Sequence, residues 1–217
     1  MNLENGILRL NNPLLIGYGG GGSVYTFDGS DIVVKISWAN SADSVRRECR
    51  TLQYLESKSV TCTERCLGFA GYEYDDSNRV MIAVSPYVAD AVASVGELSA
   101  INLQAKAVQQ ISQTLVQMLA HNIVTIDVQP LISQATGDVI FIDMTEAQVL
   151  RPPFSFLDQT LMGSFCSEMI ALIPEQFANL AAACVRDEVK RLAAQGTLLS
   201  NEAQEVLYSQ TFFFSED

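Results

Sequence analysis

The stretch from Gly17 to Gly22 constrains the fold most, because it places five glycines in six positions and then runs into residues that favour strands. The following "SVYTFDGSDIVVKIS" is rich in β-branched and aromatic side chains. Its Asp-Gly turn between two apolar runs is typical of a β-hairpin. We therefore expect strand, glycine loop, strand, turn and strand over residues 14–38.

Beyond this beginning, the spacing of the apolar residues predicts alternating strand and helix segments. In chain order these are a helix with Ser41 as its N-cap, two strands within 66–88, a helix from about Ser99 to His121, a hairpin over 131–144, and helices from about Phe156. The sequence therefore predicts an α+β fold. Residues 1–88 would form an antiparallel sheet with one helix, and residues 89–217 a mostly helical part.

Charge and composition exclude several classes of protein. There are 25 acidic residues and 13 basic ones, which gives a formal charge of −12 and makes a nucleic-acid or anionic-membrane surface unfavourable. No apolar run is long enough to span a membrane, and the first ten residues lack the pattern of a cleavable signal peptide. We expect a soluble, cytoplasmic monomer.

The chain has five unevenly spaced cysteines, which favours reduced thiols over a disulfide framework. Cys62 and Cys66 lack further metal ligands at zinc-site spacing, so we do not expect them to bind a metal.

Three glycine motifs could account for the loop, and the flanking residues distinguish them. A dinucleotide fingerprint requires a helix directly after the glycines, where this chain continues as strand. A Walker A loop requires a lysine after the last glycine, and Gly22 is followed by Ser23. The third motif, G-x-G-x-x-G-x-V between two strands, is matched by Gly17, Gly19, Gly22 and Val24.

Further motifs follow the loop in a fixed order. They are "VVK" ending at Lys35, "RECRTLQYL" with Glu48, "TIDVQPLI" with Asp127, and "IDM" with Asp143. In this order they resemble the glycine loop, the strand lysine, the helix glutamate, the catalytic loop and the metal-binding motif of the protein-kinase superfamily. The resemblance spans about residues 14–165 and implies a bilobal kinase-like domain.

The resemblance implies a role for each of these residues, with ATP and Mg²⁺ as cofactors. The glycines at 17, 19, 20 and 22 would approach the phosphates through their backbone N–H groups, and Lys35 would contact the α- and β-phosphates. Glu48 would hold Lys35, with Glu56 as the alternative partner. Val24 and Tyr87 would border the adenine. Asp127 would be the catalytic base, and Asp143 would bind the metal.

Some positions depart from the kinase pattern. Thr125 and Ile126 replace its His and Arg, and Ile132 replaces the metal-binding Asn. One metal would then suffice, or Ser133 or Gln134 would supply the missing ligand, or the chain would be a pseudokinase.

The "DQTLMG" segment resembles the start of a kinase helix in which Asp158 would be buried and would bond to the catalytic-loop backbone. Only fifteen positions separate Asp143 from Asp158, which is too short for an ordinary activation loop. Trp38 we assign to packing.

The leading hypothesis is a constitutively active protein kinase that phosphorylates Ser or Thr. Its short C-terminal part resembles minimal bacterial effector kinases, which implies a host chaperone or a ubiquitin-conjugating enzyme as partner and secretion into a host cell without a cleavable signal peptide. The alternatives are a pseudokinase that acts as a protein-binding module and a small-molecule phosphotransferase.

Overall fold

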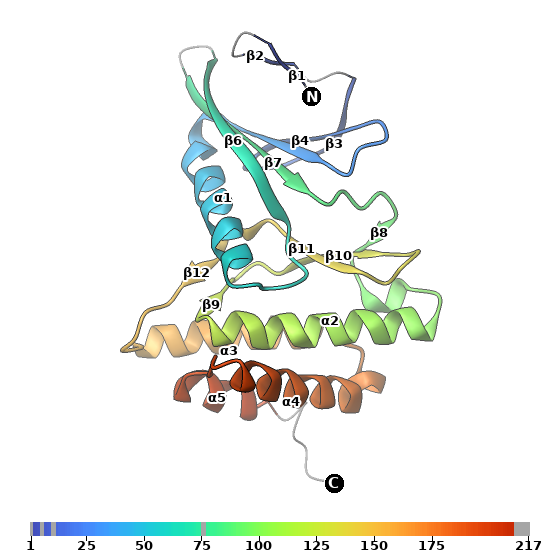
Figure 1. Cartoon of the computed structure of the whole chain (residues 1–217), viewed down its shortest axis with the longest axis vertical. Helices are drawn as coiled ribbons and strands as arrows, with labels where there is room; N and C mark the ends of the chain where they lie inside the picture. The colour runs from blue at the N-terminus through green and yellow to red at the C-terminus, as the bar shows by residue number, and fades with distance from the viewer. Residues whose placement is uncertain (1, 5–6, 10–11, 75–76, 211–217) are drawn as a thin grey trace. The chain divides into compact units, whose positions relative to one another are not determined.

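The computed structural model describes residues 2–4, 7–9, 12–74 and 77–210, which form an α+β fold with antiparallel sheets and five α-helices (Figure 1). Contacts between residues divide the chain into two units. The first comprises Met1–Gln53 and Glu64–Val88, and the second comprises Tyr54–Thr63 and Ala89–Asp217. Residues 54–63, although they precede Glu64 in the chain, group with the second unit.

A five-stranded antiparallel sheet is the main element of the first unit. Its strands in spatial order are β3 (Pro13–Tyr18), β4 (Gly22–Phe27), β5 (Val33–Ser37), β7 (Ser77–Ser85) and β6 (Arg65–Tyr74). The strand, glycine loop, strand, turn and strand predicted from the sequence are therefore present. A separate pair, β1 (Asn2–Glu4) and β2 (Ile7–Arg9), lies before the sheet in the chain.

Helix α1 (Ala42–Ser57) follows β5, as its spacing predicted. The apolar stripe of Val45, Cys49 and Leu52 is buried, each side chain being no more than 5% exposed. Glu48 precedes Cys49 directly and is also buried. A carboxylate beside an apolar helical stripe needs a partner, because burying an isolated charge is costly.

The second unit is built around α2 (Ile101–Ala120), along which α4 (Ala178–Ala194) runs in Figure 1. Ten residues of α2 are buried, which agrees with the predicted buried helix. The remaining helices are α3 (Phe156–Ala171) and α5 (Asn201–Tyr208), the latter capped by the Ser200 side chain.

Short strands complete the second unit: β8 (Ala91–Val92), β9 (Ile123–Val124), β10 (Gln129–Ser133), β11 (Val139–Ile142) and β12 (Gln148–Val149). β10 and β11 form an antiparallel hairpin in which Gln129 lies opposite Ile142. Gly137 makes its turn with φ 69°, where a side chain would be strained and a Cβ atom would lie 2.8 Å from the Leu103 carbonyl oxygen. The hairpin predicted over 131–144 is therefore present.

Among the residues that the structure describes, no helix is both long and apolar enough to cross a membrane. Residues 75–76, which lie between the two strands expected within 66–88, and the C-terminal segment 211–217 are outside the described residues.

Candidate functional site

Lys35 on β5 forms two ion pairs within the first unit. Its ammonium nitrogen lies 2.6 Å from Oε1 of Glu48 on α1 and 2.7 Å from Oε2 of Glu64, which immediately precedes β6. The Glu48 pairing is the one that the kinase resemblance implied. Glu56, the alternative partner, has an exposed side chain.

The electrostatics of this cluster keep Lys35 charged. Burial disfavours the ammonium form, but the charges of Glu64 and Glu48 outweigh it and raise the pKa of Lys35 above its ordinary value. The two glutamate side chains are each 3% exposed, against 15% for Lys35. Lys35 is therefore shared between two buried carboxylates.

Glu64 is a functional candidate that reasoning from sequence missed. It belongs to none of the kinase motifs, and it lies in the irregular segment between α1 and β6, where spacing gives no information about orientation. The one available signal was its position next to the strand that begins at Arg65. Because burying an unpaired charge is costly, a carboxylate next to a buried strand is expected to have a partner on a neighbouring element.

The glycine-loop hairpin and the lysine strand are adjacent in the sheet. Gly17 lies opposite Val24, and Val24 lies opposite Lys35, so the three residues form one row across β3, β4 and β5. Directly opposed residues of antiparallel strands project to the same face, which places the side chains of Val24 and Lys35 together. Three of the predicted site residues are thus brought together by strand register.

Three carbonyl groups of the glycine loop accept hydrogen bonds from the segment that follows β5. The Trp38 indole N–H donates to the Gly19 oxygen at 2.8 Å, and its backbone N–H donates to the Gly21 oxygen at 3.0 Å. The Ser41 hydroxyl donates to the Gly20 oxygen at 3.0 Å. Trp38 therefore does more than pack, and Ser41, predicted as a helix cap, bonds to the loop.

Gly22 is the one loop glycine at which the surrounding structure forbids a side chain. A Cβ atom there would lie 2.0 Å from the Ile36 carbonyl oxygen. At Gly19, Gly20 and Gly21, by contrast, a Cβ atom would meet nothing within 4 Å. The glycine content at these three positions is therefore not explained by packing within the loop.

Tyr87, predicted to border adenine, is half-buried in the segment after β7. Its backbone N–H donates to the Asp31 carbonyl oxygen at 2.6 Å, which attaches this segment to the turn before β5.

Asp127 and Asp143 lie at the same end of the β10–β11 hairpin in the second unit. Asp127 is two residues before Gln129, and Asp143 follows Ile142, the residue opposite Gln129. Neighbouring strands are about 4.8 Å apart, so the backbone segments that carry the two aspartates extend from adjacent strand ends. The side-chain amide of Gln129 donates to Oδ2 of Asp127 at 2.6 Å.

The backbone of Asp143 adopts the left-handed conformation, with φ 56° and ψ 58°. This region is uncommon for residues other than glycine, although Asp tolerates it better than most, and such residues cluster at functional sites. The Thr145 hydroxyl donates to the Asp143 carboxylate. Asp127 is exposed and Asp143 is half-buried, so both carboxylates are accessible to solvent.

Ile132 cannot take part in metal binding, because it is fully buried in β10, opposite Val139 and Val92. Ser133, an alternative ligand considered above, lies at the turn end of the hairpin, and its hydroxyl donates to Asp90 at 3.1 Å. That end is opposite the one that carries Asp143.

Gln129 lies opposite Ile142, the residue that precedes Asp143, so it is at the same end of the hairpin as the two aspartates. It is the first residue of β10, which begins only two residues after Asp127. The carboxylate oxygens of Asp127 and Asp143 and the amide oxygen of Gln129 are the hard ligands that Mg²⁺ prefers, so this donor set fits the ion. Across the described ranges, no three His, Cys, Asp or Glu side chains form a metal-binding group.

Asp158 does not have the buried position that the resemblance implied. It lies in the first turn of α3, where its carboxylate accepts hydrogen bonds from the Ser155 backbone N–H and hydroxyl, both at 2.7 Å. The Ser155 hydroxyl in turn accepts from the Asp158 N–H, which completes a capping box. These bonds lower the pKa of Asp158, and its role is to start the helix.

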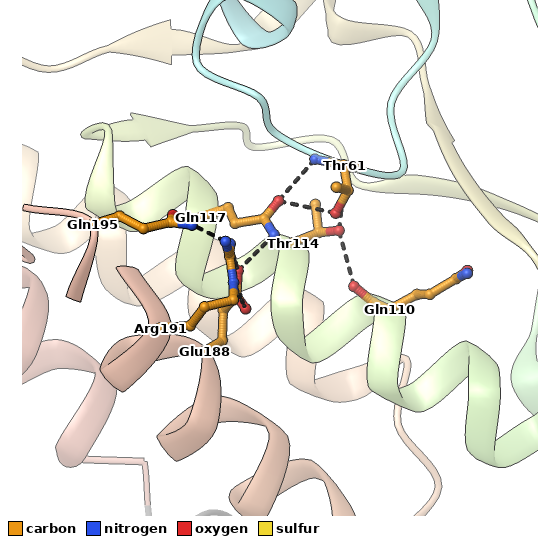
Figure 2. A network of polar contacts seen from close by, with 7 residues as sticks. All are labelled: Thr61, Gln110, Thr114, Gln117, Glu188, Arg191 and Gln195. Carbon is orange, nitrogen blue, oxygen red and sulfur yellow. Dashed lines mark hydrogen bonds and ion pairs between the residues drawn. The ribbon is translucent and has the colours of Figure 1, made fainter. Parts of the chain in front are cut away.

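Gln117 on α2 is the centre of a polar network in the second unit (Figure 2). Its side-chain oxygen accepts from the backbone N–H and the hydroxyl of Thr61, and its amide nitrogen donates to Glu188 on α4 at 2.6 Å. Arg191 donates to both carboxylate oxygens of Glu188. The bonds of Gln117 join α2 to Thr61 and to α4, so we assign this network to stability.

The candidate residues thus form two separate groups of side chains, each within one unit. The first unit carries the glycine loop, Lys35, Glu48 and Glu64, and the second carries two aspartates with Gln129. No protein-family model matches the chain, and no curated protein matches its sequence.

Proposed function

We propose that the protein is an ATP-dependent protein kinase that transfers the γ-phosphate to Ser or Thr of a partner protein, its two units being the lobes of one kinase-like domain. The observation that carries this proposal is the buried ion pair between Lys35 and Glu48, on the strand next to the glycine-loop hairpin. A helix glutamate that holds a strand lysine beside a glycine loop is the arrangement with which kinases bind the α- and β-phosphates.

A glycine-rich hairpin without a ligand would not explain this pair. Burying an ion pair is often no better for stability than burying apolar residues of the same volume. A function that needs a cation in a fixed position therefore explains the pair more simply than the stability of the fold does.

The second unit supplies the groups for the chemical step. Asp127 accepts the proton of the substrate hydroxyl as its oxygen forms a bond to the γ-phosphorus, while the bond from that phosphorus to the leaving ADP oxygen breaks. Asp143 and Gln129 would hold Mg²⁺, which neutralises charge on the phosphates when bound. Gln129 also orients Asp127 through its 2.6 Å hydrogen bond.

The short connection after Asp143 favours constitutive activity. Between Asp143 and Asp158 the chain forms one 3-10 turn (Met144–Glu146) and the two-residue strand β12, which pairs with β9. This leaves little chain that phosphorylation would need to order.

The test is transfer of radiolabel from γ-labelled ATP to casein. We expect transfer by the wild-type protein and by Glu97→Gln, which alters an exposed carboxylate outside the site. We expect at least about a hundredfold loss in Asp127→Asn, the range typical of a lost general base, and in Lys35→Met and Asp143→Asn. Equal labelling by wild type and all three variants would exclude the proposal.

A pseudokinase is the second candidate, and two observations favour it. Ile132 is buried where the motif expects a metal ligand, and Glu64 adds a second carboxylate to the lysine. Binding of ATP without transfer to casein or to the protein itself would support this alternative.

A further inference from the structure

The glycine loop is attached at three successive residues to one short segment. The carbonyl oxygens of Gly19, Gly20 and Gly21 accept from the Trp38 indole, the Ser41 hydroxyl and the Trp38 backbone N–H, at 2.8, 3.0 and 3.0 Å. A fourth bond closes the loop itself, from the Gly19 N–H to the Gly22 oxygen at 3.0 Å.

These bonds determine the direction of the amide groups. In a trans peptide the C=O of one residue and the N–H of the next point in opposite directions. Because the carbonyls of Gly19, Gly20 and Gly21 point toward residues 38–41, the N–H groups of Gly20, Gly21 and Gly22 point away from that segment. Successive N–H groups directed to one side form an anion-binding concavity.

The absence of side chains at the same residues agrees with this orientation. A Cβ atom at Gly20 or Gly21 would meet no protein atom within 4 Å, so their faces are open in the described part of the chain. An open, outward-directed N–H array can be approached closely by a phosphate oxygen.

The Trp38 ring also contacts a charged side chain. The guanidinium carbon of Arg79 on β7 lies 5.9 Å from the centre of the Trp38 ring, which is cation–π distance. This contact orients the indole, and it brings a positive charge to the residue that bonds the loop.

We propose that Trp38 and Ser41 are positioning residues that hold the glycine loop with the N–H groups of Gly20, Gly21 and Gly22 directed at a phosphate group. The proposal rests on the nucleotide site proposed above and adds the residues that pre-form it. It also explains how a loop with five glycines in six positions, which would otherwise lose much entropy on binding, is ordered beforehand.

The test compares ligands with and without phosphate, using isothermal titration calorimetry with ADP, adenosine and inorganic pyrophosphate. The variants are Trp38→Phe, which removes the indole N–H but keeps a ring for Arg79, and Ser41→Ala. Loss of one such hydrogen bond corresponds to about a fivefold change in affinity. We expect ADP and pyrophosphate affinity to fall about fivefold in each variant and adenosine affinity to stay unchanged. Ser41→Thr, which keeps the hydroxyl, should restore binding.

The outcomes separate this inference from the proposed function. Unchanged ADP binding in both variants, or an equal loss for ADP and adenosine, would overturn the positioning role while leaving the kinase proposal intact. Pyrophosphate binding that depends on Trp38, in a protein that binds no ADP, would support the loop inference and reject the kinase. Binding of neither ligand by the wild type would overturn both. Circular dichroism and thermal unfolding of each variant show that the comparison is made between folded proteins.

Discussion

The ammonium nitrogen of Lys35 lies 2.7 Å from Glu64, about as close as it lies to Glu48 at 2.6 Å. Glu48 projects from a regular helix, whereas Glu64 lies just outside a strand. In the proposed nucleotide complex, a phosphate that approaches Lys35 would also approach the two carboxylates in a buried setting, where charges interact more strongly than in water. Glu64 would then compete with the phosphate for the lysine.

Replacing Glu64 with Gln should increase the affinity for MgADP. The amide keeps an oxygen that can accept from Lys35, but the negative charge that would repel a phosphate is gone. We expect about a tenfold tighter dissociation constant, equivalent to about 1.4 kcal/mol, measured by calorimetry. Glu97→Gln is the matched control and should bind as the wild type does. Weaker binding by Glu64→Gln would show that Glu64 supports Lys35 in the nucleotide complex.

Gly22→Ala should destabilise the protein, whereas Gly20→Ala should not. The new methyl group at position 22 would overlap the Ile36 carbonyl oxygen at 2.0 Å, and at position 20 it would meet nothing within 4 Å. We expect Gly22→Ala to lower the free energy of unfolding by about 1–3 kcal/mol, as overpacking does. Gly20→Ala should stay within about 0.5 kcal/mol of the wild type. Urea unfolding measures both, and equal stability of the two variants would contradict the close approach at Gly22.

The larger elements could be predicted because each repeats a simple pattern over many residues. β-Branched alternation and an Asp-Gly turn predicted β4 and β5, and the spacing of Val45, Cys49 and Leu52 predicted α1. The Lys35–Glu48 pair was also predicted, because the motif fixes one residue on a strand and the other on the following helix.

Other features were beyond prediction because they depend on the register of elements that are not neighbours in sequence. Strands β9 and β12 have two residues each, too few to show any period. The position of Gln129 at the end of the hairpin that carries Asp143 follows from β10 beginning at residue 129, whereas the sequence pattern predicted a hairpin from residue 131. The Trp38 bond to the loop joins residues 19 apart in sequence, and an indole gives no sequence signal for its hydrogen-bond partner.

Restoring the motif residue with Ile132→Asn should not create a metal site. The side chain at 132 is fully buried among apolar neighbours, so an amide there would lose its hydrogen bonds to water. We expect the free energy of unfolding to fall by about 1–3 kcal/mol. Calorimetric titration of the nucleotide-free protein with Mg²⁺ or Mn²⁺ should show no gain in affinity.

Gln129→Leu removes an amide that we place in the site, and it should lower catalytic activity without changing the free energy of unfolding. Gln129 is half-buried and bonds to the exposed Asp127, so we expect little change in urea unfolding. We expect a lower kcat and a higher KM for MgATP, because the amide would both orient Asp127 and hold Mg²⁺. Wild-type kcat in this variant would assign Gln129 a passive role.

Glu188 should make the stability of the protein depend on pH. Burial by itself raises the pKa of Glu188, but hydrogen bonds from Arg191 and Gln117 outweigh it, so the folded-state pKa lies below its ordinary value. A carboxylate with a depressed pKa stabilises the fold above its unfolded pKa, near about 4.3, and this contribution is lost as the pH falls through the folded value.

The measurement is the difference in the free energy of unfolding between wild type and Glu188→Gln, determined in urea from pH 7 to pH 3. We expect the variant to be less stable by about 1–3 kcal/mol near pH 7, because the charge-assisted bonds to Arg191 are lost. The difference should shrink below about pH 4.3, where Glu188 of the unfolded wild-type chain takes up a proton. Glu205→Gln, on the exposed face of α5, should show no such difference. A difference in the free energy of unfolding that stays constant from pH 7 to pH 3 would mean that Glu188 acts through its shape and not through its charge.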